Sequence, residues 1–285
     1  MSKEITDDIE KVVDDIEDTV DDINEIAEEP NIKRIPEIDF FKGIAVLSMV
    51  LFHIFYMANM MDMAKFPVDK GMLNIMARVA QLIFISCIGI NLVLSRQKYK
   101  NKVEEFHKRK TQRVLYMAVV AMIITLLTYL AFPDKYVKFG IVHFAATSVF
   151  LLQWLAGSEI AIFVFVLGII FLESIKYNLI PFFHNNIHPM ISFILGIYNP
   201  KYNSMDHFSL IPNIAIIGLG MLIGYALYQD TRRKYKEMDN VLDPIFNLNN
   251  RIINILQWIG KRSFLVYMIH FPVIYFVYAA LKRII

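Results

Sequence analysis

The sequence lacks most of the features that build a soluble enzyme or a disulfide-bonded secreted domain. Its 285 residues include a single cysteine, Cys87, which excludes an internal disulfide framework and a zinc site built from cysteines. It has no phosphate-binding glycine loop, no serine nucleophile elbow and no nucleic-acid-binding motif, so we expect no nucleic-acid partner. The N-terminal segment is acidic, the opposite of a secretory leader, so we expect no cleaved signal peptide.

Hydrophobic residues are abundant instead, and charge is divided unevenly along the chain. Hydrophobic residues make up 56% of the sequence, whereas a soluble domain is usually about 45–50% apolar, so the composition favours a membrane protein. Residues 1–39 hold 15 acidic and 4 basic residues, whereas the remainder holds 12 acidic and 25 basic residues. We therefore divide the chain into an acidic tail, residues 1–33, and a membrane domain, residues 34–285.

The acidic tail repeats with a period of seven residues between positions 7 and 29. Ile9, Ile16 and Ile23 occupy the same position of this repeat, which predicts an amphipathic helix with an apolar stripe. Two interpretations stay open for this cytoplasmic segment. It is either a solvated tail or a helix that docks on a basic partner surface.

The membrane domain contains seven stretches that are apolar and, with one exception, close to the length needed to cross a bilayer. An eighth apolar stretch, Ile187–Ile197, is too short to cross and is expected to be re-entrant or interfacial. The sequence thus predicts an all-α polytopic membrane protein with seven, or at most eight, transmembrane helices. The seven spans are Phe40–Met60, Met72–Leu94, Arg113–Phe132, Phe139–Leu155, Ile160–Leu172 (with an extension toward Asn178), Leu210–Tyr228 and Phe264–Leu281.

Basic loops predict the orientation of these spans. The segments Arg96–Arg113 and Asp230–Arg262 are rich in lysine and arginine, and such loops favour the cytoplasmic side. Seven crossings then place the N-terminus in the cytoplasm and the C-terminus outside. We expect a multi-pass protein of the cell membrane with the lipid bilayer as its first partner.

Ionisable residues inside a span are costly and therefore point to function. The first span carries Asp39, Lys42 and His53 on one helical face. Lys42 and His53 are separated by about 16 Å along the axis, so a cation lies near the inner surface and an imidazole beyond mid-membrane. This arrangement suits a long ligand with an anionic head and a deep reactive end. The alternative is that Asp39 and Lys42 are interfacial and His53 bonds a neighbouring helix.

Two more histidines fall within predicted spans. His143 lies near the outer end of the fourth span, and His270 is central in the last span, just before the helix-distorting Pro272. Each is either part of a polar cavity or a packing hydrogen bond. The outer loop residues His184 and His188 give only a weak metal-binding signal, so no metal is expected.

Five blocks, in order, resemble the prokaryotic relatives of heparan-alpha-glucosaminide N-acetyltransferase and, more distantly, the transmembrane acyltransferase superfamily. The first block combines Asp39, Lys42 and Gly43 with His53, although the family usually has arginine in place of Lys42. The resemblance covers the chain from Arg34 onward. The blocks are Arg34–His53, Phe84–Leu94, Phe139–Phe144, Asp206–Pro212 with Gly218–Gly224 behind it, and Ile259–His270.

The resemblance implies transfer of an acetyl group from cytosolic acetyl-CoA to an amine or hydroxyl acceptor, such as a sugar or glycan, at the outer face. It places the donor near Lys42 and Asp39, with Arg34 or the loop that ends at Arg113 on its phosphates. His53 then acts as a base or as a transiently acetylated nucleophile. The remaining roles fall to Asp206, which is expected to orient His53, and to His143 or His270, which are expected to donate to the oxyanion.

Two functions of other classes compete with an acetyltransferase. A small-molecule or proton-coupled transporter would use the same histidines as a proton relay. A membrane scaffold would use the acidic tail to recruit a basic partner. The sequence leaves the acceptor, the choice between N- and O-transfer, and a homo-oligomer open.

Overall fold

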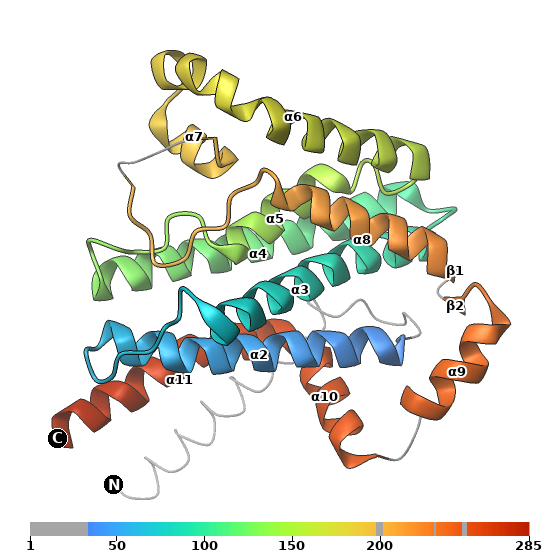
Figure 1. The fold of residues 1–285 in the computed structure, drawn as a ribbon. Helices are drawn as coiled ribbons and strands as arrows, with labels where there is room; N and C mark the ends of the chain where they lie inside the picture. The colour runs from blue at the N-terminus through green and yellow to red at the C-terminus, as the bar shows by residue number, and fades with distance from the viewer. Residues whose placement is uncertain (1–33, 198–201, 231, 247–249, 285) are drawn as a thin grey trace, which may run out of the picture.

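A computed structural model describes residues 34–197, 202–230, 232–246 and 250–284 (Figure 1). The predicted tail helix lies outside these residues. The regular elements of the described part are helices and one short antiparallel hairpin, in which Tyr228 pairs with Arg233, and loops connect them. The helices are α2 (Pro36–Met60), α3 (Gly71–Lys98), α4 (Val103–Ala131), α5 (Ile141–Leu152), α6 (Glu159–Asn186), α7 (Pro189–Leu195), α8 (Asn213–Leu227), α9 (Lys236–Phe246), α10 (Arg251–Lys261) and α11 (Ser263–Ile284), and the strands are β1 (Tyr228–Gln229) and β2 (Arg232–Arg233).

The predicted all-α membrane class is confirmed. Among the described residues, five helices are long and apolar enough to cross a membrane, namely α2, α3, α4, α6 and α11. The fourth and sixth predicted spans form the shorter apolar helices α5 and α8, of 12 and 15 residues. The predicted count of seven full-length spans is therefore not established, although both shorter helices lie within the bundle (Figure 1).

Other segments differ from the sequence prediction in extent. Helix α6 continues to Asn186, well beyond the predicted end of the fifth span. The predicted re-entrant or interfacial stretch forms the seven-residue helix α7, which ends at Gly196 with φ near 80°. The predicted basic loop 230–262 contains two further helices, α9 and α10. The predicted apolar spans do not include them because each is amphipathic rather than apolar throughout.

Local sequence explains where the helices begin. Pro36 occupies the first turn of α2, where its missing N–H costs no hydrogen bond, and Glu37 and Asp39 interact favourably with the helix dipole there. The Ser158 hydroxyl accepts a hydrogen bond from the N–H of Ala161 at the start of α6. These signals set the ends of helices whose length comes from continuous apolar sequence.

Glycines allow two close helix contacts that hold the bundle together. A Cβ at Gly89 or Gly220 would collide with the backbone of the facing helix, so α3 and α8 approach closely only because both positions are glycine. In the same way, Gly43 of α2 and Gly260 of α10 bring these two helices into backbone contact.

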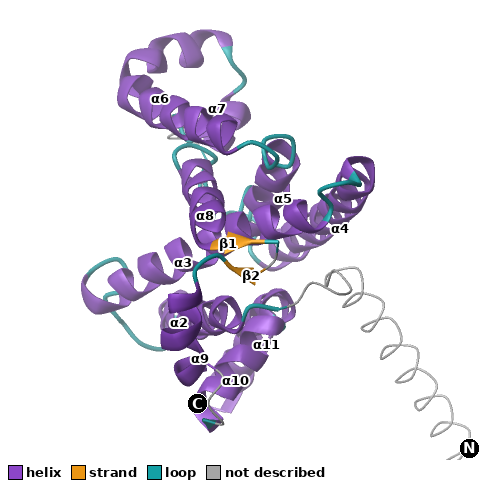
Figure 2. Ribbon diagram, turned by 90° about the vertical axis from the view of Figure 1, so that its right-hand side faces the viewer, coloured by secondary structure: helices purple, strands orange, loops and turns teal. Residues whose placement is uncertain are grey.

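The bundle has two distinct ends. The start of α2, the end of α3, the hairpin, α9 and α10 lie together at one end, which we call the basic end (Figure 1). The loop between α4 and α5 and the segment before α8 meet at the opposite end, the far end, where the Phe208 N–H donates to the Phe139 carbonyl over 2.9 Å. Helix α6, with α7, lies on the side of the bundle away from α10 and α11 (Figure 2).

Candidate active site

The start of α2 places three of the predicted donor residues together at the basic end. Asp39 is buried, and its carboxylate lies 3.4 Å from Lys42 Nζ and 3.7 Å from Arg34 Nη1. Lys42 and Asp39 are one helical turn apart, so the helix itself brings them into contact. The predicted grouping of Arg34, Asp39 and Lys42 is therefore present in the structure.

A cavity of about 360 Å³, which we call the donor cavity, begins beside these residues. Helices α2, α3, α4, α5 and α11 contribute to its walls, and most of its interior is apolar. Asp39 is the one acidic residue among the described residues that line it. The cations that line it are Arg34, Lys42, Lys110, Arg113, Lys261 and Arg262.

Sequence reasoning missed two of these cations, Lys261 and Arg262. Both lie just before the last predicted span, and this position at a membrane-facing helix end was the signal that could have identified them. What brings them to the cavity is α10, whose backbone contacts α2 at Gly43 and at Asp39. An anionic group at this end of the cavity would therefore meet cations from α2, α4 and the α10–α11 junction.

His53 and His270 meet deeper in the bundle, on α2 and α11. His53 Nδ1 lies 3.2 Å from His270 Nε2 and 2.9 Å from the carbonyl of Met49. His270 Nδ1 in turn contacts the carbonyl of Tyr267. Along α2, the charged cluster at Lys42 and the imidazole pair at His53 are thus separated by the eleven residues that the sequence analysis pointed out.

The two carbonyl contacts assign the tautomer of each ring. A carbonyl oxygen only accepts, so Nδ1 of His270 carries the hydrogen and its Nε2 has the lone pair. His53 Nδ1 then carries a hydrogen shared between Met49 and His270, which leaves the lone pair of His53 on Nε2. Within the described chain, His53 Nε2 has no hydrogen-bond partner. It is the nitrogen available to accept a proton or attack a carbonyl.

Asp206 occupies the segment before α8, at the far end. Its Oδ2 accepts a hydrogen bond of 3.1 Å from the N–H of Ile141, the first residue of α5. Burial raises the pKa of Asp206 to about 6, although the hydrogen bond from Ile141 opposes this change. In the structure the ring of His53 is held by Met49 and His270, and Asp206 is held by Ile141, so an orienting role of Asp206 toward His53 stays a prediction.

His143 is committed to the local structure of α5. Its Nδ1 accepts from the N–H of Gly140 over 3.4 Å, and its Nε2 lies 3.2 Å from the hydroxyl oxygen of Thr125. That hydroxyl donates to the Val137 carbonyl, so it accepts from His143. Both ring nitrogens are therefore engaged, which agrees with the packing interpretation of this histidine and leaves no nitrogen for an oxyanion in this arrangement.

Two residues that line the donor cavity also form hydrogen bonds with Asp206 and His270. Ile141 and Tyr267 both line the cavity, and they hold Asp206 and His270 through a backbone N–H and a backbone carbonyl. The Tyr267 side chain is also near enough to Asp206 to interact with it electrostatically. Tyr267 lies in the fifth sequence block, Ile259–His270, but no role of its own was evident from the sequence.

A model of the catalytic region of heparan-alpha-glucosaminide N-acetyltransferase matches residues 34–272. The chain belongs to this family. The resemblance found in the five sequence blocks is thereby confirmed. No curated protein and no solved structure matches the chain individually.

As a member of the heparan-alpha-glucosaminide N-acetyltransferase family, the chain is a multi-pass membrane acetyltransferase. The matched segment begins at Arg34 and ends two residues after His270, so it includes every candidate residue described above. The acidic tail lies outside it. Among the described residues, no three histidine, cysteine, aspartate or glutamate side chains group closely enough to hold a metal ion.

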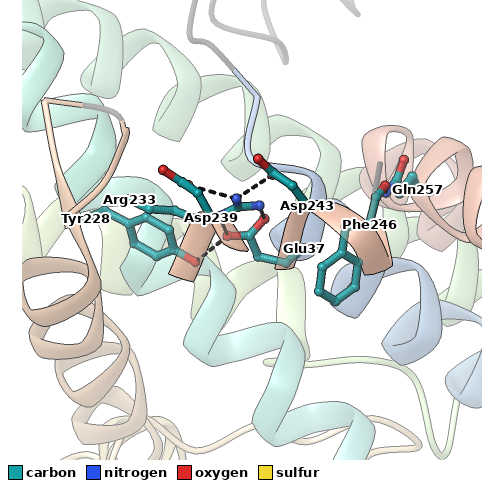
Figure 3. Close-up of polar contacts among 7 residues, drawn as sticks. All are labelled: Glu37, Tyr228, Arg233, Asp239, Asp243, Phe246 and Gln257. Atoms are coloured by element: carbon teal, nitrogen blue, oxygen red, sulfur yellow. Dashed lines mark hydrogen bonds and ion pairs between the residues drawn. The ribbon is translucent and has the colours of Figure 1, made fainter. Parts of the chain in front are cut away.

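A buried ion pair ties the start of α2 to the hairpin and α9 (Figure 3). Arg233 Nε and Nη2 donate to the two oxygens of Glu37, each over 2.9 Å, and the Tyr228 hydroxyl donates to the same carboxylate. The pKa of Arg233 is raised by these hydrogen bonds and by those to Asp239 and Asp243. This cluster fixes the first turn of α2, which carries Asp39 and begins two residues after Arg34.

Proposed function

We propose that the chain transfers the acetyl group of acetyl-CoA to an amine or hydroxyl acceptor, with a sugar or glycan as the substrate class. The observation that carries this proposal is the position of the His53–His270 pair. His53 lies eleven residues beyond Lys42 on α2, a helix that contributes to the donor cavity, and His270 meets it from α11. Charge at one end and an imidazole base at depth suit a donor with phosphates at one end and a thioester at the other.

In the donor complex, the phosphates of acetyl-CoA bind the cations of the basic end. Lys42, Arg113 and Arg262 come from three parts of the chain, so they surround an anion rather than touch it from one side. The pantetheine arm runs along the apolar walls that α3, α4, α5 and α11 contribute to the cavity. The basic end faces the cytoplasm and the far end faces outward, as the basic loops favour.

His53 Nε2 supplies the base for transfer. It removes a proton from the acceptor as the acceptor attacks the thioester carbonyl, and the thiolate that leaves takes up a proton to give CoA. His270 accepts from His53 Nδ1–H and so stabilises the ring when it becomes charged. The same Nε2 is the nucleophile if the acetyl group passes through His53, and labelling of the chain by radioactive acetyl-CoA without acceptor separates the two routes.

Donor binding is the first test of this function. Purified full-length protein in nanodiscs is heated in the presence of increasing acetyl-CoA, with acetate as the control. A saturable rise in melting temperature is expected, because a ligand that binds only the folded state stabilises it. The Lys42→Met variant should need about tenfold more acetyl-CoA for the same rise, whereas Lys42→Arg should stay close to the original chain.

Transfer itself is then measured with radiolabelled acetyl-CoA and a set of amino sugars and glycans. Labelled acceptor formed by the original chain supports the proposal. A folded protein that shows no shift with acetyl-CoA and labels no acceptor would contradict it and favour the transporter.

A further inference from the structure

A second cavity, of about 370 Å³, lies at the basic end and shares no lining residue with the donor cavity. Arg96 of α3 and Lys100, just beyond the end of this helix, line it, whereas Cys87 and Asn91 of α3 line the donor cavity. At 3.6 residues per turn Arg96 lies on the face of α3 opposite Cys87 and Asn91. The second cavity is therefore separate from the proposed acetyl-CoA site, with α3 between them.

Three cations line the second cavity, and in the described part of the chain none of them forms an ion pair with a carboxylate. They are Arg96, Lys100 and Lys234. Arg96 is half-buried, and its guanidinium is held by the carbonyl of Tyr99 at 3.3 Å and by the ring of Phe106 at 5.8 Å. A guanidinium that is held in place without a carboxylate partner is suited to bind the oxygens of a phosphate.

The same cavity also offers hydrogen-bond acceptors. Glu159 and Asp230 contribute carboxylates to its wall. Gln97 donates from Nε2 to the Tyr228 carbonyl over 3.2 Å, and its buried Oε1 has no hydrogen-bond partner among the described residues. An anion made only of acceptor oxygens would leave these groups unused, whereas a phosphate ester that also carries hydroxyl groups would use both kinds of partner.

Gly157 leaves room beside Arg96. A Cβ at this position would lie 3.4 Å from Arg96 Nε and meets no closer atom. A larger side chain here would occupy the space in front of the guanidinium without disturbing a backbone contact. This position therefore allows the cavity to be filled while its charges are kept.

We propose that the second cavity binds a glycerophosphate group, with Arg96 and Lys234 on the phosphate and the carboxylates and Gln97 on the glycerol hydroxyls. The site lies beside the helix ends at which a membrane presents its headgroups. Two sources carry this chemistry, namely the headgroup of phosphatidylglycerol and free glycerol phosphate. The site is independent of the acetyl-CoA site, so either can fail without the other.

The test uses the full chain in nanodiscs and three variants. Arg96→Gln removes the held cation, and Gly157→Leu fills the cavity while keeping every charge. Arg109→Gln, on exposed α4 surface outside both cavities, is the matched loss of one arginine. In nanodiscs of phosphatidylcholine alone, binding of radiolabelled glycerol 3-phosphate is titrated. In nanodiscs that also contain phosphatidylglycerol, native mass spectrometry counts the phosphatidylglycerol retained by each chain.

Saturable binding of glycerol 3-phosphate identifies the free ester as the ligand, and retention of one phosphatidylglycerol identifies the lipid. In either case Arg96→Gln and Gly157→Leu should weaken binding at least about tenfold, and Arg109→Gln should leave it unchanged. Saturating acetyl-CoA should not displace the ligand. If neither molecule binds, or if both cavity variants bind as the original chain does, the proposal is overturned. Should Arg96→Gln fail to fold, Gly157→Leu decides alone.

Discussion

The two ends of the functional stretch of α2 stabilise buried polar groups in different ways. At its start, Glu37 and Asp39 are charged and are held by cations, with Arg233 on one and Lys42 and Arg34 on the other. Eleven residues beyond Lys42, His53 is held by a carbonyl and by a second imidazole. The first arrangement fixes a charge, whereas the second leaves a nitrogen that can gain a proton. The difference indicates that the start of the helix binds and the deeper part reacts.

Removal of the base should have the largest effect. In His53→Ala the transfer rate is expected to fall about 10²–10⁴-fold, because no other group takes the proton of the acceptor. The acetyl-CoA dissociation constant should change little, since the cations lie at the other end. Rates from labelled acetyl-CoA and affinities from thermal shifts check the two parts. His184→Ala, at an exposed position on α6, is the control, and full activity of His53→Ala would remove this residue from the mechanism.

Loss of a charge partner should instead act on stability. In Glu37→Gln the guanidinium of Arg233 loses its buried carboxylate, which is expected to cost on the order of 3–5 kcal/mol of unfolding free energy. Asp239→Asn removes an exposed partner of the same arginine and should cost only about 0–1 kcal/mol. Melting temperatures in one detergent compare them. Equal losses of unfolding free energy in the two variants would mean that the buried contact of Arg233 with Glu37 is no stronger than its exposed contact with Asp239.

The second histidine should matter less than the first. In His270→Ala the charged ring of His53 loses one acceptor, worth about 1.5–3 kcal/mol, so the rate should fall about tenfold to a hundredfold with donor affinity kept. In His270→Gln a side-chain oxygen can replace that acceptor, and part of the rate should return. A positioning role predicts this recovery. If Gln and Ala variants are equally slow, His270 does more than accept a hydrogen bond.

The smallest effect concerns the pH dependence of stability at the far end. Because burial raises the pKa of Asp206 to about 6, the folded chain binds this proton more tightly than the unfolded chain does. The stability gained from the proton is present at about pH 4 and is lost as the pH rises through about 6. Melting temperatures of the original chain should fall by a few degrees over this range relative to Asp206→Asn. A constant difference between the two proteins would show that Asp206 is not buried enough to matter.

The sequence was sufficient for the features that depend on neighbours along the chain. Continuous apolar stretches predicted α2, α3, α4, α6 and α11, because a bilayer requires length and hydrophobicity and both can be read locally. Helical spacing placed Lys42 and His53 at different depths on one face. The amphipathic helices α9 and α10 escaped the same reasoning, since their mixed composition is also that of a basic loop.

Contacts between distant segments were decided by the tertiary structure alone. His53 and His270 are 217 residues apart, and only the packing of α2 and α11 makes one the partner of the other in place of Asp206. Likewise, Arg233 reaches Glu37 because the hairpin lies beside the start of α2. The sequence determined which residues are costly to bury and how deep they lie. The fold decided which of them meet, because a hydrogen bond or an ion pair requires contact in space and the spacing along the chain does not specify it.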